Sequence, residues 1–398
     1  MRRIILITCI AMLVFMVGFW FVSIASAGKP SPPGEKLPWG VDRIDADLVW
    51  NALGGTKGTG VKVAILDTGI DKGHPDLPDT TKGVNFVDKG DYPNPDDPNE
   101  NGSPDNYGDT HGHGTELAGV IAALDNDIGV IGVGPEIEIW TVRIRKTLGI
   151  YPDSYPDLSV EYNFTDLCEG MDWCLSHDIQ VINFSLGLCT IKYDQNGNPL
   201  AKYRLHDWQF YSRIKAAAEQ GIIMVAAAGN DGRRIEKFNP SNYLGVDYED
   251  AEDRYMFPAS YPEVIAVSAT GIKKVGKTTT DYVASWSNYG PAIELSAPGD
   301  SIYTTYLNNG YTTVGGTSLS CPHVVGTAAL LLAIGEPASS VRNRLITTAE
   351  DLGTSGLDEY FGYGLVDAQK AVFGVRSAPP LLSSDNKLSV TWGKLKGN

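Results

Sequence analysis

The stretch Gly315-Gly316-Thr317-Ser318-Leu319-Ser320-Cys321-Pro322-His323 opens into an apolar run that continues to Ala333. Its two glycines allow a sharp turn, and Pro322 favours the first turn of a helix, where a missing N–H costs little. The residues that follow are apolar on every side, which predicts a helix buried in the core. Ser318 then lies at the start of this helix, beside unpaired N–H groups and the positive end of the helix dipole.

Ser318 has two interpretations at that position. The positive end of a helix suits a nucleophile whose reaction develops negative charge. Serine is also a common helix N-cap that does no chemistry. The stretch alone does not separate the two, so supporting residues must come from elsewhere in the chain.

Six other segments are short and apolar, and helical stretches separate several of them. This pattern indicates an α/β, doubly wound fold: a mostly parallel sheet with helices on both faces. The expected strands are 61–66, 138–144, 179–186, 222–228, 264–269 and 292–297, and the expected helices include 167–177, 211–220 and 341–349. Catalytic and ligand-binding groups collect at the carboxyl ends of such strands.

Polar residues lie at the ends of these elements. Asp67 follows strand 61–66, Asn230 follows strand 222–228, and His113 begins a helical stretch. Asp67-Thr68-Gly69 also resembles the motif of aspartic proteases, whose chemistry needs two carboxylates that share a proton. The sequence contains no second Asp-Thr-Gly or Asp-Ser-Gly, which excludes that mechanism.

His111 and His113 are spaced by one residue, a pattern that also occurs in zinc sites. No matching cluster of cysteine, histidine or carboxylate ligands is evident elsewhere in the sequence, so we do not expect zinc here. A single histidine at a helix start is usually structural, and His113 needs support from other residues.

The composition restricts the class of partner. The chain of 398 residues has a formal net charge of −16, which argues against binding to nucleic acid or to anionic membrane surfaces. Its hydrophobic content of 42% is typical of a globular protein with a sizeable core.

The N-terminus has the pattern of a signal peptide over residues 1–27. Met1-Arg2-Arg3 precedes an apolar run from Ile4 to Ile24, and Ala25-Ser26-Ala27 fits a signal-peptidase site. We expect a secreted, extracellular protein cleaved after Ala27. The alternative is a membrane anchor formed by residues 4–24, because the run is nearly long enough to span a bilayer. Residues 28–34 are expected to form a Pro-rich linker, and residues 374–398 a C-terminal tail.

Asp67, His113 and Ser318 form a set, because the sequence around each resembles the subtilisin-like serine peptidases (subtilases). The matching motifs are Asp67-Thr68-Gly69, His113-Gly114-Thr115-Glu116-Leu117-Ala118-Gly119, Ala227-Ala228-Gly229-Asn230 and Gly316-Thr317-Ser318-Leu319-Ser320-Cys321-Pro322-His323. Ser320 stands where the family usually has alanine. The resemblance runs from about Pro38 to Val372 and implies a peptidase domain over 35–373 with a three-layer sandwich fold.

The resemblance implies a serine endopeptidase that works through an acyl-enzyme intermediate. Ser318 would attack the scissile carbonyl, His113 would act as the base, and Asp67 would orient the imidazole. The Asn230 amide and the Ser318 backbone N–H would bind the oxyanion. His113 rather than His111 matches the catalytic position, and His323 is expected to be structural.

The resemblance also implies where a polypeptide substrate binds. The peptide would add as a strand to Ser185-Leu186-Gly187, and Ala228-Gly229 would form part of the pocket for the main side chain. Met256 stands near this pocket where the family often has glycine. The acidic run 247–253 precedes it in sequence. That run would favour basic substrate residues, or it is a solvated loop or a cation site without influence on specificity.

A structural calcium ion (Ca²⁺) is implied as well, since the segment 124–130 resembles the family's calcium loop. Six residues would supply oxygen ligands: the side chains of Glu35, Asp76 and Asn126, and the carbonyls of Leu124, Ile128 and Val130. The alternative is a turn that needs no metal.

Other functions stay open at this level. The fold without activity would be a binding protein, but the intact triad and Asn230 oppose this. A narrow processing peptidase and a broad degradative one are equally compatible with the sequence. We expect the protein to be a monomer. We also expect it to fold without a covalent prodomain, because little chain separates Ala27 from the start of the resemblance.

Overall fold

The computed structural model describes residues 34–52, 54–87, 103–147, 160–162, 164–187, 191–193, 199–202, 208–240, 255–276 and 278–374. The predicted signal peptide, nearly all of the linker and of the C-terminal tail, and the acidic run 247–253 lie outside these ranges. None of the helices within them has the length and apolar character that a membrane crossing requires.

A mostly parallel sheet of eight strands forms the centre of the described structure. Its order is β11-β10-β9-β6-β1-β3-β2, with β12 beside β10, and the one antiparallel pairing is between β10 and β11. The strands are β1 (Lys62–Asp67), β2 (Gly83–Asn85), β3 (Glu138–Arg143), β6 (Val181–Phe184), β9 (Ile223–Ala227), β10 (Ile265–Val275), β11 (Thr278–Val283) and β12 (Ile293–Pro298). The predicted fold class is therefore confirmed.

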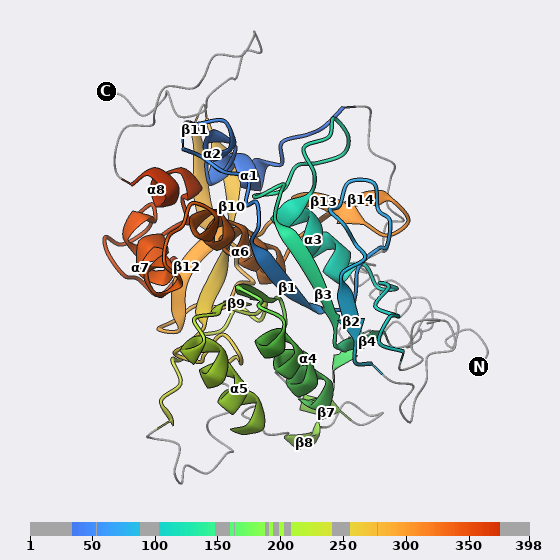
Figure 1. Cartoon of the computed structure of the whole chain (residues 1–398). Helices are drawn as coiled ribbons and strands as arrows, with labels where there is room; N and C mark the ends of the chain where they lie inside the picture. The colour runs from blue at the N-terminus through green and yellow to red at the C-terminus, as the bar shows by residue number, and fades with distance from the viewer. Residues whose placement is uncertain are drawn as a thin grey trace, which may run out of the picture.

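Helices cover both faces of the sheet, which makes three layers (Figure 1). The helices are α1 (Trp39–Arg43), α2 (Asp47–Trp50), α3 (His113–Ala122), α4 (Phe164–Ser176), α5 (Trp208–Glu219), α6 (Thr317–Ala333), α7 (Ala338–Thr348) and α8 (Ala368–Phe373). Helices α4 and α5 pack on one face, and α3 and α6 pack on the other.

The alternation of side chains along the strands explains why both faces need a cover. In β1, Val63 and Ile65 belong to the core beneath α3 and α6, whereas Ala64 and Leu66 belong to the core beneath α4 and α5. Successive residues of a strand point to opposite faces, so a strand that is apolar throughout must be buried on both. All four of these side chains are at most 2% exposed.

Helix α6 is buried as predicted, but Pro322 lies one turn further in than expected. The helix begins at Thr317, so Pro322 is its sixth residue and falls in the second turn. A proline there cannot donate to the carbonyl four residues earlier, which is that of Ser318. That carbonyl finds another partner in the candidate site.

Three short antiparallel pairs of strands lie outside the central sheet in the described part of the chain: β4 (Arg145–Thr147) with β5 (Val160–Tyr162), β7 (Ile191–Tyr193) with β8 (Pro199–Lys202), and β13 (Ile302–Tyr306) with β14 (Gly310–Val314). None of them was predicted from the sequence, and the last one, the hairpin of β13 and β14, packs on α3. Its Thr304 and Thr305 hydroxyls donate to the Glu116 and Thr115 carbonyls of α3 at 2.8 and 2.7 Å. The hairpin therefore fixes the helix on which His113 lies.

Candidate active site

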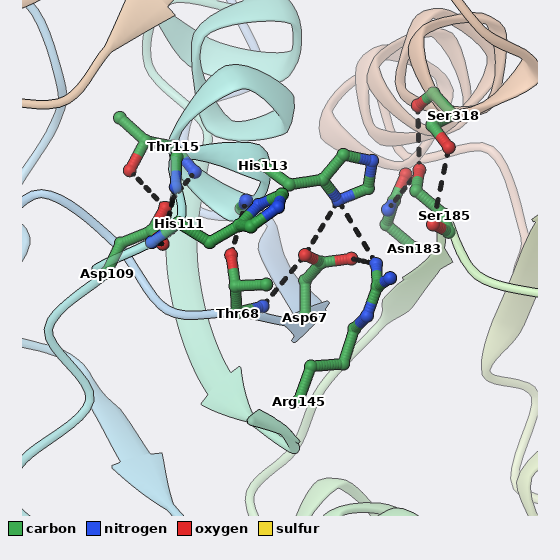
Figure 2. A network of polar contacts seen from close by, with 12 residues as sticks. Asp67, Thr68, Asp109, His111, His113, Thr115, Arg145, Asn183, Ser185 and Ser318 are labelled. Atoms are coloured by element: carbon green, nitrogen blue, oxygen red, sulfur yellow. Dashed lines mark hydrogen bonds and ion pairs between the residues drawn. The ribbon is translucent and has the colours of Figure 1, made fainter. Parts of the chain in front are cut away.

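The parallel sheet brings the candidate residues together at the carboxyl ends of its strands (Figure 2). Asp67 is the last residue of β1, Ser185 follows β6, and Asn230 lies shortly after β9. His113 is the first residue of α3 and Ser318 the second residue of α6. The sequence predicts each of these strands and helices, and they pack in the hydrophobic core.

Asp67 is fully buried and has a partner on each carboxylate oxygen. Oδ1 accepts hydrogen bonds from His113 Nδ1 at 2.7 Å and from the Thr68 backbone N–H at 2.8 Å. Arg145 Nη1 donates to Oδ2 at 3.2 Å. Burial alone favours the protonated acid, but the charges of His113 and Arg145 outweigh it and hold the pKa of Asp67 well below its usual range. The carboxylate is therefore charged whenever the protein is folded at neutral pH.

The imidazole of His113 is oriented by this carboxylate. Because Nδ1 donates to Asp67, Nε2 is left as the basic nitrogen, on the side that faces Ser318 in Figure 2. Burial opposes the charged imidazolium, but the charge of Asp67 and its hydrogen bond raise the pKa of His113 above its ordinary value. The Gly114 backbone N–H, next along the helix, donates to Thr68 Oγ1 at 2.9 Å and fixes the start of α3 against β1.

Asp109 organises the turn that leads into α3. Its Oδ1 accepts from the backbone N–H groups of His111 and Gly112 at 3.0 and 2.8 Å. Its Oδ2 accepts from the Thr115 N–H and hydroxyl at 3.0 and 2.6 Å. These bonds satisfy N–H groups at a helix start that would otherwise lack partners. Gly112 adopts a φ of 108° in this turn, a conformation that glycine tolerates best.

Ser318 is joined to Ser185 by two reciprocal hydrogen bonds. The Ser185 hydroxyl donates to the Ser318 carbonyl at 2.7 Å, the carbonyl that Pro322 leaves without a helical partner. The Ser318 hydroxyl donates in turn to the Ser185 carbonyl at 3.4 Å. The serine hydroxyl thus points toward the residue that follows β6, and no hydrogen bond joins it to His113 in the described structure. Catalytic hydrogen bonds are often unmade in enzymes without substrate and form only when the substrate binds.

The side-chain amide of Asn230 is held by its oxygen. Asn230 Oδ1 accepts from the Thr317 N–H at 2.9 Å and from the Thr317 hydroxyl at 2.8 Å. Thr317 Oγ1 also accepts from the Gly229 N–H at 3.0 Å. With its oxygen fixed in this way, the amide presents its NH₂ group beside Gly316, the residue two before Ser318. A donor that is held in place in this way can stabilise negative charge that develops beside it.

The residues predicted to bind substrate lie along two neighbouring strand ends. Ser185 and Leu186 are buried after β6, and Ala228 and Gly229 follow β9. Asn288 fixes the second segment, since its Nδ2 donates to the Ala228 carbonyl at 2.8 Å and its N–H to the Gly229 carbonyl at 2.9 Å.

The side chain of Met256 lies between these two segments. A Cβ atom added to Gly187 would lie 2.5 Å from Met256 Sδ, and one added to Gly229 would lie 2.7 Å from Met256 Cε. Met256 itself is 3% exposed. The thioether therefore occupies the space that separates the two glycines.

The segments predicted to bind calcium also come together. Glu35 Oε1 accepts from the backbone N–H groups of Asn126 and Asp127 at 2.8 and 3.2 Å. Asp76 Oδ2 accepts from the Val130 N–H at 2.9 Å, while its Oδ1 is buried without a hydrogen-bond partner in the described structure. Burial raises the pKa of Asp76 to about 7.

Several residues of the site were not predicted from the sequence. Arg145, Asp109 and Asn288 are single polar residues without a motif, and Thr317 was noted only as part of the serine motif. A sequence signal exists for Asp109 alone, since an aspartate before a helix start commonly binds its free N–H groups. The role of Arg145 depends on where β3 ends, which periodicity does not define to one residue.

Comparison with known proteins agrees with this geometry. The model of the subtilase family matches residues 58–364. Subtilisin DY of Bacillus licheniformis is 34% identical over 340 residues, which cover 85% of this chain and 99% of that protein. Subtilisin Savinase of Lederbergia lenta is 32% identical over 339 residues, with 85% and 99% covered. A thermostable alkaline protease of Halalkalibacterium halodurans is 33% identical over 339 residues, with 85% and 74% covered.

The two hydrogen bonds that Thr317 donates to Asn230 Oδ1, here called the Thr317 clamp, lead to a testable prediction. Thr317→Val keeps the side-chain volume and the backbone bond to Asn230 Oδ1 but removes the hydroxyl bond. The Asn230 amide then loses part of its orientation, so kcat for a peptide substrate should fall about 10- to 100-fold with little change in KM. Thr317→Ser, which keeps the hydroxyl, should stay close to the wild-type kcat. Equal kcat values for the valine variant and the wild type would show that the clamp has no catalytic role.

Proposed function

The chain belongs to the subtilase family of serine endopeptidases, and we propose that it cleaves polypeptides through Asp67, His113 and Ser318. The observation that carries this proposal is the 2.7 Å contact between His113 Nδ1 and the fully buried Asp67 carboxylate. The charged, buried carboxylate fixes one tautomer of the histidine. Its Nε2 atom, which faces Ser318, is then left without a proton and is basic.

The reaction proceeds in two halves. His113 Nε2 accepts the Ser318 proton as Oγ attacks the scissile carbonyl, and Asp67 stabilises the imidazolium that forms. The imidazolium then gives its proton to the leaving amine, which leaves an acyl-enzyme at Ser318. Water, deprotonated by the same imidazole, releases the second product.

The oxyanion of each tetrahedral intermediate needs donors placed in advance. We assign this role to the Asn230 NH₂ group and the Ser318 backbone N–H. Losing one such donor typically costs about 3 kcal/mol of activation free energy. Both donors come from segments tied to Thr317, so the stabilising groups need not reorganise during the reaction.

The substrate backbone is proposed to add as a strand to 185–187. Ala228 and Gly229 then line the space for the side chain that precedes the cleaved bond. Met256 already fills much of that space, because its Sδ and Cε atoms lie 2.5 and 2.7 Å from where Cβ atoms on Gly187 and Gly229 would be. We therefore propose cleavage after small residues such as alanine, whereas large aromatic side chains are excluded.

The donor set at 124–130 fits a calcium ion. The carboxylates of Glu35 and Asp76 both accept hydrogen bonds from backbone N–H groups of the segment 124–130. Asp76 Oδ1 is buried and has no hydrogen-bond partner in the described structure. Glu35 and Asp76 also repel each other, which a divalent cation relieves. The described residues include no cluster of three or more His, Cys, Asp or Glu side chains suited to a metal. A calcium site built largely from the backbone carbonyls of Leu124, Ile128 and Val130 does not need such a cluster of side chains.

We further propose that the protein acts outside the cell as a monomer. The support for export is the sequence pattern of residues 1–27, with the anchor formed by residues 4–24 as the alternative. Calcium is plentiful in extracellular settings, which agrees with the proposed metal site. The acidic run 247–253 lies outside the described residues, so both of its interpretations stay predictions: an influence on basic substrate residues, or a solvated loop or cation site.

Active-site labelling tests the proposed nucleophile. A fluorophosphonate probe should label the folded protein at Ser318, because the probe reacts only with a serine that a neighbouring base activates. Ser318→Ala should abolish labelling, and His113→Ala should reduce it by about 10³-fold or more. Ser320→Ala, two residues along the same helix, serves as the control and should label like the wild type. Labelling that persists in Ser318→Ala would overturn the assignment.

The occupied space beside Gly229 gives a prediction on specificity. Met256→Gly removes the thioether, so kcat/KM for a peptide with phenylalanine before the cleaved bond should rise about tenfold or more. The matched peptide with alanine at that position should change little, because its side chain does not need the space. If the wild type already prefers phenylalanine, Met256 does not limit the pocket.

Chelation tests the calcium site. In a Ser318→Ala background, which prevents self-digestion, EGTA should lower Tm by about 5 °C or more relative to excess Ca²⁺. Asp76→Asn should remove most of this difference, because the buried carboxylate is lost. Asp79→Asn, an exposed aspartate three residues further on, should keep it. An unchanged Tm in EGTA would contradict the site.

A further inference from the structure

Arg145 contacts the triad directly, although no motif of the sequence singles it out. It opens β4, immediately beyond the end of β3, whose last residue Arg143 pairs in register with Asp67. Its Nη1 lies 3.2 Å from Asp67 Oδ2 and 3.4 Å from His113 Nδ1 (Figure 2). The second contact joins two groups that both carry hydrogens, so the guanidinium and the imidazole share the carboxylate rather than bind each other.

The guanidinium is largely removed from water to make this contact. Its side chain is 16% exposed, and its Nε is buried without a hydrogen-bond partner in the described structure. A charge in such a position is screened weakly. Arginine also stays charged over the whole pH range in which proteins fold, so this cation is present at every step of the reaction.

The other titratable groups around His113 in the described structure come from α3, from the turn that precedes it and from β13. Glu116 follows it on α3, His111 and Asp109 lie in the preceding turn, and Tyr306 of β13 packs against that turn. Burial raises the pKa of Glu116 to about 8, and burial lowers the pKa of His111 to about 4, so both are mainly neutral near pH 7.

On the side of β6 and α6, the side chains that face His113 are those of Asn183, Ser185 and Ser318, which carry no charge. Among the residues that the structure describes, the charged groups next to His113 are thus Asp67, Asp109 and Arg145.

We propose that Arg145 is a positioning residue that anchors Asp67 and keeps His113 in its neutral, basic form at a lower pH than the carboxylate alone would allow. The inference rests on the proposed function of the triad. Asp67 favours the imidazolium, and Arg145 opposes it, since two like charges within a few ångströms repel. The net charge of −16 on the chain also favours the imidazolium, so Arg145 opposes both effects.

The pH profile of kcat/KM tests the proposal, because its acid limb reports the titration of the free enzyme's base. Arg145→Met removes the charge at similar length and should move the apparent pKa of the acid limb upward by about half a unit to one unit. Arg145→Lys keeps the charge and should leave the limb close to the wild-type position. Arg213→Met removes an arginine that pairs with Asp172 between α5 and α4, and it should also leave the limb unchanged.

The outcomes separate the two proposals. A limb that stays fixed in Arg145→Met, with kcat lowered equally at every pH, would mean a structural role only and would overturn the inference. A limb that moves equally in Arg145→Lys would show that the charge is not the cause and would overturn it as well. Absence of Ser318 labelling in the wild-type protein would instead reject the proposed function itself.

Discussion

The site depends on one buried charge, the carboxylate of Asp67 at the end of β1. A carboxylate removed from water is costly unless hydrogen bonds and opposite charges compensate it. Here the compensation comes from the Thr68 N–H, from His113 and from Arg145. Each of these partners is held in turn by the fold, so the need to satisfy Asp67 determines how the start of α3 is placed.

A backbone carbonyl that needs a hydrogen-bond partner also connects Ser318 to the sheet. Pro322 deprives the Ser318 carbonyl of its helical partner, and the Ser185 hydroxyl takes that place across 133 residues of sequence. A proline inside a helix usually weakens it. In α6 the lost bond is replaced by one that fixes the position of Ser318, the proposed nucleophile, relative to β6, where we propose that substrate binds. Stability and function therefore share this contact.

The sequence predicts the architecture well and the details of the site less well. Apolar runs such as 61–66 and 222–228 locate the strands of a parallel sheet, because only burial on both faces permits such runs. The local motifs identify Asp67, His113 and Ser318, which the structure brings to one edge. Arg145 and the hairpin 302–314 escaped prediction, because their roles depend on tertiary contacts that leave no periodic or motif signal. Pro322 was placed one turn too early, since the residue at which α6 begins depends on Thr317 binding Asn230.

The contact with Asp67 determines the tautomer of the neutral His113 imidazole. NMR of ¹⁵N-labelled protein, with the resonance assigned by its loss in His113→Gln, reports which ring nitrogen carries the proton. We predict a protonated Nδ1 with a strongly downfield proton signal and a bare Nε2 above the pH at which the imidazolium titrates. A neutral imidazole with its proton on Nε2 would contradict the account, because that nitrogen could then not accept the Ser318 proton.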